Sequence, residues 1–212
     1  MPYLSRLVVD SRSPRVLADL VSVYEMHRTL RRAFPAADAD NRVLFRVDTD
    51  PRTGRPALLV QSREPADWSF LAEMPDYLYL PGDLDLANPA QKPLVLDLRA
   101  GELLAFRLRA NPTFRRGRRR LAWLRRADQL AWLQRCGARG GFAPVALTVT
   151  QEGAVWTRKR VGGVSQGLCF RSVLFAGWLR VTDPQTLAET VADGLGSGKA
   201  FGFGLLSLGP AR

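Results

Sequence analysis

The spacing of apolar and polar residues divides the chain into two similar series of strands and helices. In the first half, alternating or short apolar runs predict strands at 3–10, 44–50, 56–62 and 77–80. A helical stretch separates the first two runs, and a weaker helix is expected at 67–74. The resulting order, β-α-β-β-α-β, is typical of a ferredoxin-like domain and of RRM-like sheets that bind RNA.

The second half repeats this order with longer strands, which are predicted at 94–112, 142–151, 154–161, 168–181 and 203–208. Turns are expected at Glu152-Gly153 and Gly162-Gly163, and helices at 127–137, ended by Gly137, and after Asp183-Pro184. The sequence thus predicts an α+β protein of two tandem ferredoxin-like (RRM-like) βαββαβ domains with antiparallel sheets. The expected boundaries are an N-terminal domain at 1–82, a Pro-, Asp- and Gly-rich linker at 83–93, and a C-terminal domain at 94–212.

Composition indicates a folded protein with a polyanionic partner. Hydrophobic residues make up 46% of the 212 residues and charged residues 24%, which is typical of a globular chain. The net charge of +11 favours nucleic acid, with an acidic membrane surface or a purely solubilising charge as alternatives. No apolar run has the length of a membrane span or signal peptide, so a cytoplasmic location is expected. The two cysteines lack CxxC spacing, which argues against a zinc site or a disulfide framework.

The only histidine of the chain, His27, lies in a predicted amphipathic helix. Ser22 and Glu25 have the spacing of a capping box, which places the helix start at Val23. One face of this helix then carries Tyr24, His27, Arg28 and Arg31. Such a set suits RNA cleavage by the ribose 2′-hydroxyl, because histidine can act as base or acid and arginines can hold the phosphorane oxygens without a metal. The alternative is that His27 is an ordinary packed helix residue.

Three further segments carry residues that could contact RNA. The glycine-rich segment 194–204 can approach a phosphodiester closely and is not a Walker A loop, because alanine follows its lysine; the alternative is a plain turn. Arginines are concentrated at 115–120, where a solvated charge run is the alternative. Strand residues 158–160 could line an RNA groove or form a protective basic edge. Together with two arginines of the strand predicted at 94–112, the candidate RNA-binding residues are Arg107, Arg109, Arg115, Arg116, Arg118, Arg119, Arg158, Lys159, Arg160, Gly196, Gly198 and Lys199.

Three motifs together resemble the CasE family, the CRISPR RNA-processing endoribonucleases of type I-E systems. They are YEMHRTL after the first strand, FRLRANP at the start of the second half, and GLGSGKAFGFGLLSL at the C-terminus. At matching positions the resemblance implies catalysis by His27, Tyr24 and Arg28, with Arg32 as a further phosphate-positioning cation. It implies metal-independent cleavage of CRISPR repeat RNA at the 3′ base of its stem-loop. The product would carry a 2′,3′-cyclic phosphate or related 3′ end, and no cofactor would be needed.

The resemblance also implies the partners of the protein. These are the CRISPR repeat stem-loop, the mature guide RNA that stays bound after cleavage, and the other protein subunits of the Cascade surveillance complex. A monomer is expected when the chain is free, and no membrane association. Two alternatives from other classes are a non-catalytic RNA-binding module and a structural subunit that binds protein partners without cleaving RNA.

Overall fold

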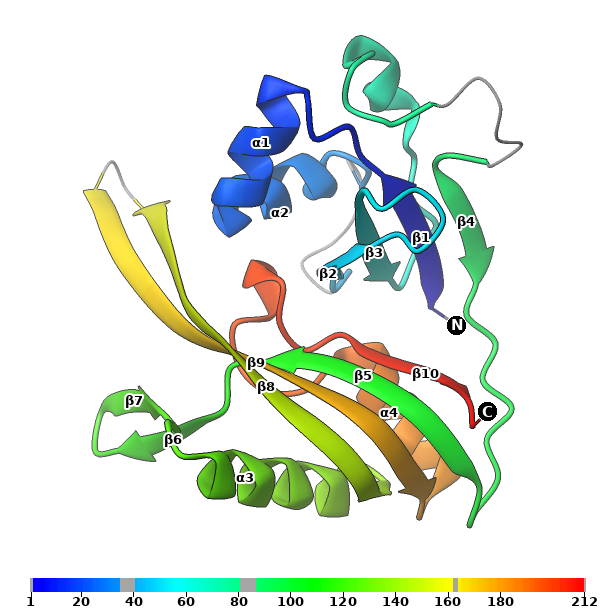
Figure 1. Cartoon of the computed structure of the whole chain (residues 1–212), viewed down its shortest axis with the longest axis vertical. Helices are drawn as coiled ribbons and strands as arrows, with labels where there is room; N and C mark the ends of the chain where they lie inside the picture. Colours follow the sequence, from blue (N-terminus) through cyan, green and yellow to red (C-terminus); the bar gives the residue numbers. More distant parts are fainter. Residues whose placement is uncertain (1, 35–40, 81–86, 162–163, 212) are drawn as a thin grey trace. The chain divides into compact units, whose positions relative to one another are not determined.

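The computed structural model describes residues 2–34, 41–80, 87–161 and 164–211. The chain forms two compact units. The first contains residues 1–95 together with 157–166 and 200–202, and the second contains 96–156, 167–199 and 203–212. Each unit is built around a four-stranded sheet with helices, as Figure 1 shows.

The first unit has the strand order of a ferredoxin-like fold, β2-β3-β1-β4. Its elements in chain order are β1 (Tyr3–Val8), α1 (Pro14–Val21), α2 (Val23–Arg31), β2 (Leu44–Thr49), β3 (Pro56–Ser62), the short 3-10 helix η1 (Ser69–Glu73) and β4 (Ala90–Pro93). Strand β1 is antiparallel to both β3 and β4, and β2 is antiparallel to β3. Side chains from β1, β2 and β3 pack with those of the helices, and the cluster includes Leu7, Phe45, Val60, Met26 and Leu30.

The last strand of this unit is not where the apolar pattern predicts it. The strand expected at 77–80 is wrong, since β4 lies at Ala90–Pro93, inside the stretch 83–93 expected to be a linker. Tyr77 is only 2% exposed because its ring belongs to the core and its hydroxyl donates to Asp19. Leu78 makes only an isolated bridge with Val9. An edge strand such as β4 pairs through its backbone and so needs no apolar signature.

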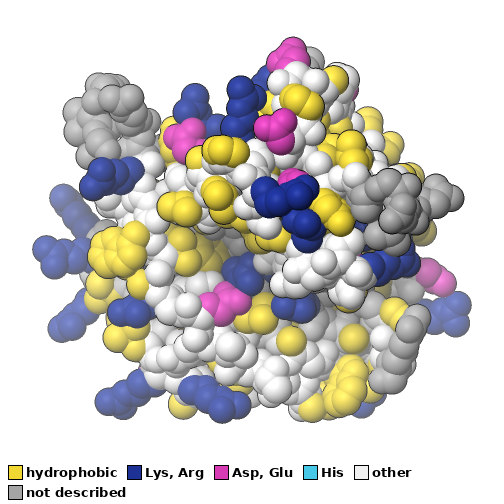
Figure 2. Space-filling view, turned by 45° about the horizontal axis from the view of Figure 1, so that its top comes forward, with side chains coloured by type: hydrophobic (Ala, Val, Ile, Leu, Met, Phe, Trp, Pro, Cys, Tyr) yellow, Lys and Arg dark blue, Asp and Glu magenta, His cyan; other side chains and the backbone are white. Residues whose placement is uncertain are grey.

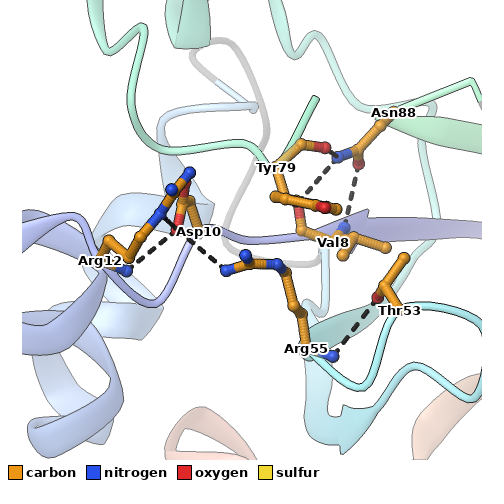
Figure 3. Close-up of polar contacts among 7 residues, drawn as sticks. All are labelled: Val8, Asp10, Arg12, Thr53, Arg55, Tyr79 and Asn88. Carbon is orange, nitrogen blue, oxygen red and sulfur yellow. Dashed lines mark hydrogen bonds and ion pairs between the residues drawn. The ribbon is translucent and has the colours of Figure 1, made fainter. Parts of the chain in front are cut away.

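Polar contacts join the end of β1 to neighbouring loops of the first unit (Figure 3). The Asn88 side chain accepts from the Val8 N–H at 3.0 Å and donates to the carbonyl oxygens of Val8 and Tyr79. Asp10 accepts hydrogen bonds from Arg12 at 2.6 Å and from Arg55 at 3.2 Å. The Arg12 hydrogen bond is the main reason that the pKa of Asp10 falls to about 2. These contacts fix β1 to the loops around it.

The second unit has the same topology, with strand order β10-β5-β9-β8. The elements of this part of the chain are β5 (Leu103–Ala110), β6 (Thr113–Arg116), β7 (Arg119–Ala122), α3 (Arg126–Arg139), β8 (Phe142–Val161), β9 (Val164–Val181), α4 (Pro184–Asp193), the 3-10 helix η2 (Lys199–Phe201) and β10 (Leu206–Pro210). Of these, the end of β8, the start of β9 and most of η2 belong to the first unit, as residues 157–166 and 200–202. Strand β5 is antiparallel to β9 and to β10. Both sheets thus have the ferredoxin-like strand order that the sequence predicts.

Two local predictions for this unit are corrected. The runs 142–151 and 154–161 form one strand, β8, because Glu152 bonds to Arg109 of β5 and Ser172 of β9 and so stays in the sheet. Helix α3 continues through Gly137, where a Cβ would lie 2.5 Å from the Phe142 carbonyl oxygen, so this glycine serves close packing. The arginine run at 115–120 forms the hairpin β6–β7 between β5 and α3. The turn expected at Gly162-Gly163 lies outside the described residues.

Candidate active site

Helix α2 begins where the capping pattern predicts. Ser22 is its N-cap, and the Ser22 hydroxyl accepts a hydrogen bond from the Glu25 N–H at 3.4 Å. The same residue ends α1, so Ser22 separates two consecutive helices. Met26 and Leu30 point from α2 into the core, each 1% exposed. This packing fixes the rotation of the helix and therefore the positions of the residues between them.

His27 is half-buried beside the core of the first unit. Its ring centroid lies 6.3 Å from that of Phe45 on β2, with a 42° angle between the ring planes. Burial lowers the pKa of His27 below its ordinary value of 6.5, and the positive charge of Arg31 lowers it further. The neutral form, which can accept a proton, is therefore favoured at neutral pH.

The cation that acts on His27 is Arg31, one helical turn after it. The Arg31 Nη1 donates to the carbonyl oxygen of Asn41 at 3.0 Å, which directs the guanidinium along this side of the helix. The i, i+4 spacing of His27 and Arg31 was visible in the sequence. The family resemblance, however, implied that Arg28 and Arg32 are the phosphate-positioning cations, and it implied no such role for Arg31.

Arg28 and Arg32 are engaged with acidic side chains. Arg28 forms an exposed ion pair with Glu25 at 2.8 Å. Arg32 pairs with Glu73 at 3.0 Å, and its guanidinium lies 4.5 Å from the ring centroid of Phe70. Exposed pairs of this kind are weak, so a phosphate could replace either carboxylate. Their roles in phosphate binding stay predictions.

Part of the glycine-rich segment packs on the aromatic ring that contacts His27. A Cβ at Gly202 would lie 3.2 Å from Cε2 of Phe45, and Gly202 has φ +80°, a backbone conformation that favours glycine. Phe45 thus lies between the histidine and residues 200–202. Gly196 and Gly198 were the glycines predicted to contact RNA, and a positive φ at Gly202 was not foreseeable from composition.

The other selected residues of this segment are used for packing in the second unit. A Cβ at Gly196 would lie 3.0 Å from the Trp132 ring, and one at Gly198 would lie 3.0 Å from the Phe203 ring. The Lys199 Nζ donates to the carbonyl oxygen of Asp193, near the end of α4, at 2.7 Å. These contacts explain the glycines structurally, and RNA binding by the segment stays a prediction.

Arg109 of β5 forms a polar cluster with one residue of β8 and one of β9. Its Nε and Nη2 donate to Glu152 at 2.7 and 2.8 Å, and the Ser172 hydroxyl donates to the same carboxylate at 2.6 Å. Burial acts to raise the pKa of Glu152, but the hydrogen bonds from Arg109 and Ser172 hold it below its ordinary value. Arg107 is exposed on the same strand, two residues earlier.

The arginine-rich hairpin β6–β7 presents its basic side chains to solvent. The exposed residues are Arg115, Arg116, Arg118, Arg119 and Arg120. The pairing register places Arg115 opposite Arg120 and Arg116 opposite Arg119. Like charges directly opposite one another destabilise a strand pair. Phe114 and Trp123 stack at 4.2 Å at the base of the hairpin and hold the two arms together.

Basic side chains also appear elsewhere on the surface. Figure 2 shows one face of the molecule, on which Lys and Arg are spread widely and Asp and Glu are fewer. Arg158 on β8 is exposed, whereas the side chains of Lys159 and Arg160 lie outside the described part of the structure. Among the described residues, no group of three or more His, Cys, Asp and Glu could hold a metal ion. No helix in the described part of the chain is long and apolar enough to cross a membrane.

Replacing Arg31 with alanine is expected to raise the pKa of His27, because a positive charge near the imidazole is removed. His27 is the only histidine, so its ring proton gives a single, unambiguous NMR titration. The control Arg31→Lys keeps the charge and should keep the pKa low. A His27 titration that is the same in Arg31→Ala and in the unmodified protein would contradict this assignment.

Comparison with known proteins identifies the family. A family model described as "CRISPR associated protein" matches residues 2–210. The chain is 35% identical to the CRISPR-associated endoribonuclease Cse3 of Thermus thermophilus, over 98% of this chain and 100% of the relative. It is 28% identical to the CRISPR system Cascade subunit CasE of Escherichia coli K12, over 98% and 99%. The structure of Thermus thermophilus Cse3 bound to an RNA representing a pre-cleavage complex matches with a TM-score of 0.81 and 34% identity, covering 99% of each chain. The chain therefore belongs to the CRISPR-associated protein family that contains Cse3 and CasE.

Proposed function

We propose that this protein is an endoribonuclease that cleaves CRISPR repeat RNA at the 3′ base of its stem-loop, without a metal ion, and keeps the mature guide RNA bound. The observation that carries this proposal is the environment of His27, which is half-buried with a lowered pKa and has Arg31 one turn away. The relatives named as an endoribonuclease and as a Cascade subunit support the reaction class and the biological setting.

The proposed reaction starts with proton transfer from the ribose 2′-hydroxyl. Neutral His27 accepts this proton, and the 2′-oxygen then forms a bond to the adjacent phosphorus. The bond from phosphorus to the 5′-oxygen breaks, and that oxygen takes up a proton. The products are a 2′,3′-cyclic phosphate and a free 5′-hydroxyl.

A tyrosine and three arginines on α2 and at its C-cap complete the site. Tyr24, one turn before His27 and half-buried, orients the phosphate or supplies the proton to the leaving oxygen. Arg31, with Arg28 and Arg32 once a phosphate replaces their carboxylate partners, stabilises the negative charge that develops on the phosphorane. The N-terminal end of a helix also favours an anion.

The β6–β7 hairpin supplies affinity for the RNA stem. Its facing arginine pairs repel each other, and a phosphate placed between them converts this repulsion into attraction. A two-stranded ribbon is also narrow enough to follow a nucleic-acid backbone. Contacts of this kind give affinity rather than sequence specificity. We place the bound protein in the cytoplasm, as a monomer that joins the other Cascade subunits through its guide RNA.

Cleavage of a labelled repeat hairpin in single-turnover conditions tests the proposal. The expected rate is the same in EDTA and in Mg²⁺, and an RNA with 2′-deoxyribose at the scissile nucleotide should bind without being cut. The 5′ fragment should end in a cyclic phosphate. A requirement for Mg²⁺, or cutting of the deoxy substrate, would refute the 2′-hydroxyl mechanism. Tight binding with no cutting would favour a non-catalytic RNA-binding subunit, which the basic hairpin alone could support.

A further inference from the structure

Trp156 on β8 is exposed to solvent to an extent that is unusual for tryptophan. Its exposed fraction is 70%, whereas that of Trp132 is 7%. Trp132 stacks on Phe175 at 6.0 Å and so contributes to the core of the second unit. Tryptophan normally buries a large area when it stabilises a fold. The exposure of Trp156 therefore indicates that its ring contributes little to the packing of the fold.

Trp156 lies where the sheet narrows to two strands. Strand β5 ends at Ala110, opposite Val173 of β9. Glu152 of β8 is hydrogen-bonded to Ser172, just beyond that point. Strands β8 and β9 continue past the end of β5, as Figure 1 shows. Trp156 is thus carried by a two-stranded ribbon.

The charge of this ribbon favours RNA over other partners. The stretch 153–171, which contains the ends of both strands, has no Asp or Glu and has four basic residues, namely Arg158, Lys159, Arg160 and Arg171. A segment of such charge attracts a phosphate backbone. Arg158, two residues after Trp156 in the same strand, is itself exposed.

The exposed indole of Trp156 is a single aromatic ring system in open surroundings. Residues two apart along a strand share a face, so the small side chain of Ala154 lies on the same side of β8 as Trp156. A Cβ at Gly153 or at Gly167 of β9 would have no atom within 4 Å, so space is open at both positions. A single exposed side chain is far smaller than a protein–protein interface. It does match one unstacked base, and bases of single-stranded RNA stack on exposed aromatic rings.

We propose that Trp156 is a stacking platform for one unpaired nucleobase of the RNA, in a single-stranded nucleotide next to the stem. This inference rests on the proposed RNA-binding function and adds a site to it. Stacking acts on the base and is independent of the phosphate charge. Loss of the ring should therefore weaken binding without changing how binding depends on salt.

A double-mutant cycle tests the proposal with Trp156→Ala, Trp156→Phe and a series of hairpin RNAs that each carry one abasic nucleotide in the single-stranded flanks. Trp156→Ala should weaken binding of the intact RNA by about 10- to 100-fold, and Trp156→Phe should restore most of the affinity. One abasic position should weaken binding by the unmodified protein and have no effect on Trp156→Ala. The slope of log Kd against log salt concentration should be unchanged.

Trp178→Ala is the matched control, because Trp178 is also exposed, at 43%, but pairs opposite Ala105 where β9 is flanked by β5. It should bind all the RNAs as the unmodified protein does. Equal affinity of Trp156→Ala and the unmodified protein for intact RNA would overturn the proposal. So would a Trp156→Ala variant that binds every abasic RNA more weakly than the unmodified protein does, by the same factor at every abasic position. Cleavage is read in the same samples, so binding without cutting contradicts the proposed function while the abasic comparison still decides the stacking.

Discussion

Replacing His27 with alanine is expected to lower the single-turnover rate of repeat RNA cleavage by about 10²- to 10⁴-fold. The imidazole is the group of α2 whose lowered pKa leaves it neutral and able to accept the 2′-hydroxyl proton. The affinity for the hairpin should be nearly unchanged, because the basic hairpin β6–β7 is untouched. The measurement is cleavage of labelled RNA with protein in excess, together with the Kd for the uncleavable 2′-deoxy RNA.

Two further variants separate loss of chemistry from loss of structure. His27→Gln keeps a polar side chain of similar reach but has no titratable nitrogen, so it should be as slow as His27→Ala. Val21→Ala changes a residue of α1 that is 81% exposed, and it should cut at the unmodified rate. If His27→Ala cleaves as fast as the unmodified protein, His27 is a packed helix residue and the catalytic assignment is wrong.

Replacing Phe45 with alanine is expected to lower the free energy of unfolding by about 3–5 kcal/mol. Phe45 is 1% exposed and belongs to the same core cluster as Met26 and Leu30 of α2. Its ring also contacts His27 and faces Gly202. Removal leaves a cavity among all of these groups. Urea denaturation measures the loss as a lower midpoint.

The Phe45 ring also supports the active site, because it lies against His27. Phe45→Leu keeps most of the apolar volume, so it should lose much less stability than Phe45→Ala. It removes the ring that contacts His27, and cleavage should slow even at temperatures where Phe45→Leu is fully folded. Unchanged stability of Phe45→Ala would show that the ring does not fill the core as described.

The family and the fold class could be predicted because their signals are local in the sequence. The three motifs identified the family, and the family model, the relatives and the solved structure confirm it. The alternating run at 3–10 and the strand-like runs at 44–50 and 56–62 predicted β1, β2 and β3 of the first sheet, and Ser22 with Glu25 predicted the start of α2. A capping pattern depends on hydrogen bonds within a few residues, and an alternating or short apolar run reflects which faces of a strand are buried, so both can be recognised in the sequence.

Predictions failed where a residue serves a distant contact. The apolar run 77–80 is not a strand because Tyr77 is buried with its hydroxyl on Asp19, which is 58 residues away. Glu152 stays inside β8 because Arg109 and Ser172 bind it, although Glu-Gly normally indicates a turn. Polar β4 is held by its pairing with β1 and by the Gln91 side chain, which accepts hydrogen bonds from Ser5 and from the Ala66 N–H.

The sequence by itself determined which residues of the candidate site share a helix face, because the spacing of Tyr24, His27 and Arg31 follows from 3.6 residues per turn. Only the tertiary structure decided how that face is surrounded. Arg32 is drawn to Glu73 and Phe70 of η1, and β2 brings Phe45 against His27. The pKa of His27 is lowered chiefly by burial. Burial depends on which distant side chains pack around the ring, and periodicity along one helix carries no information about them.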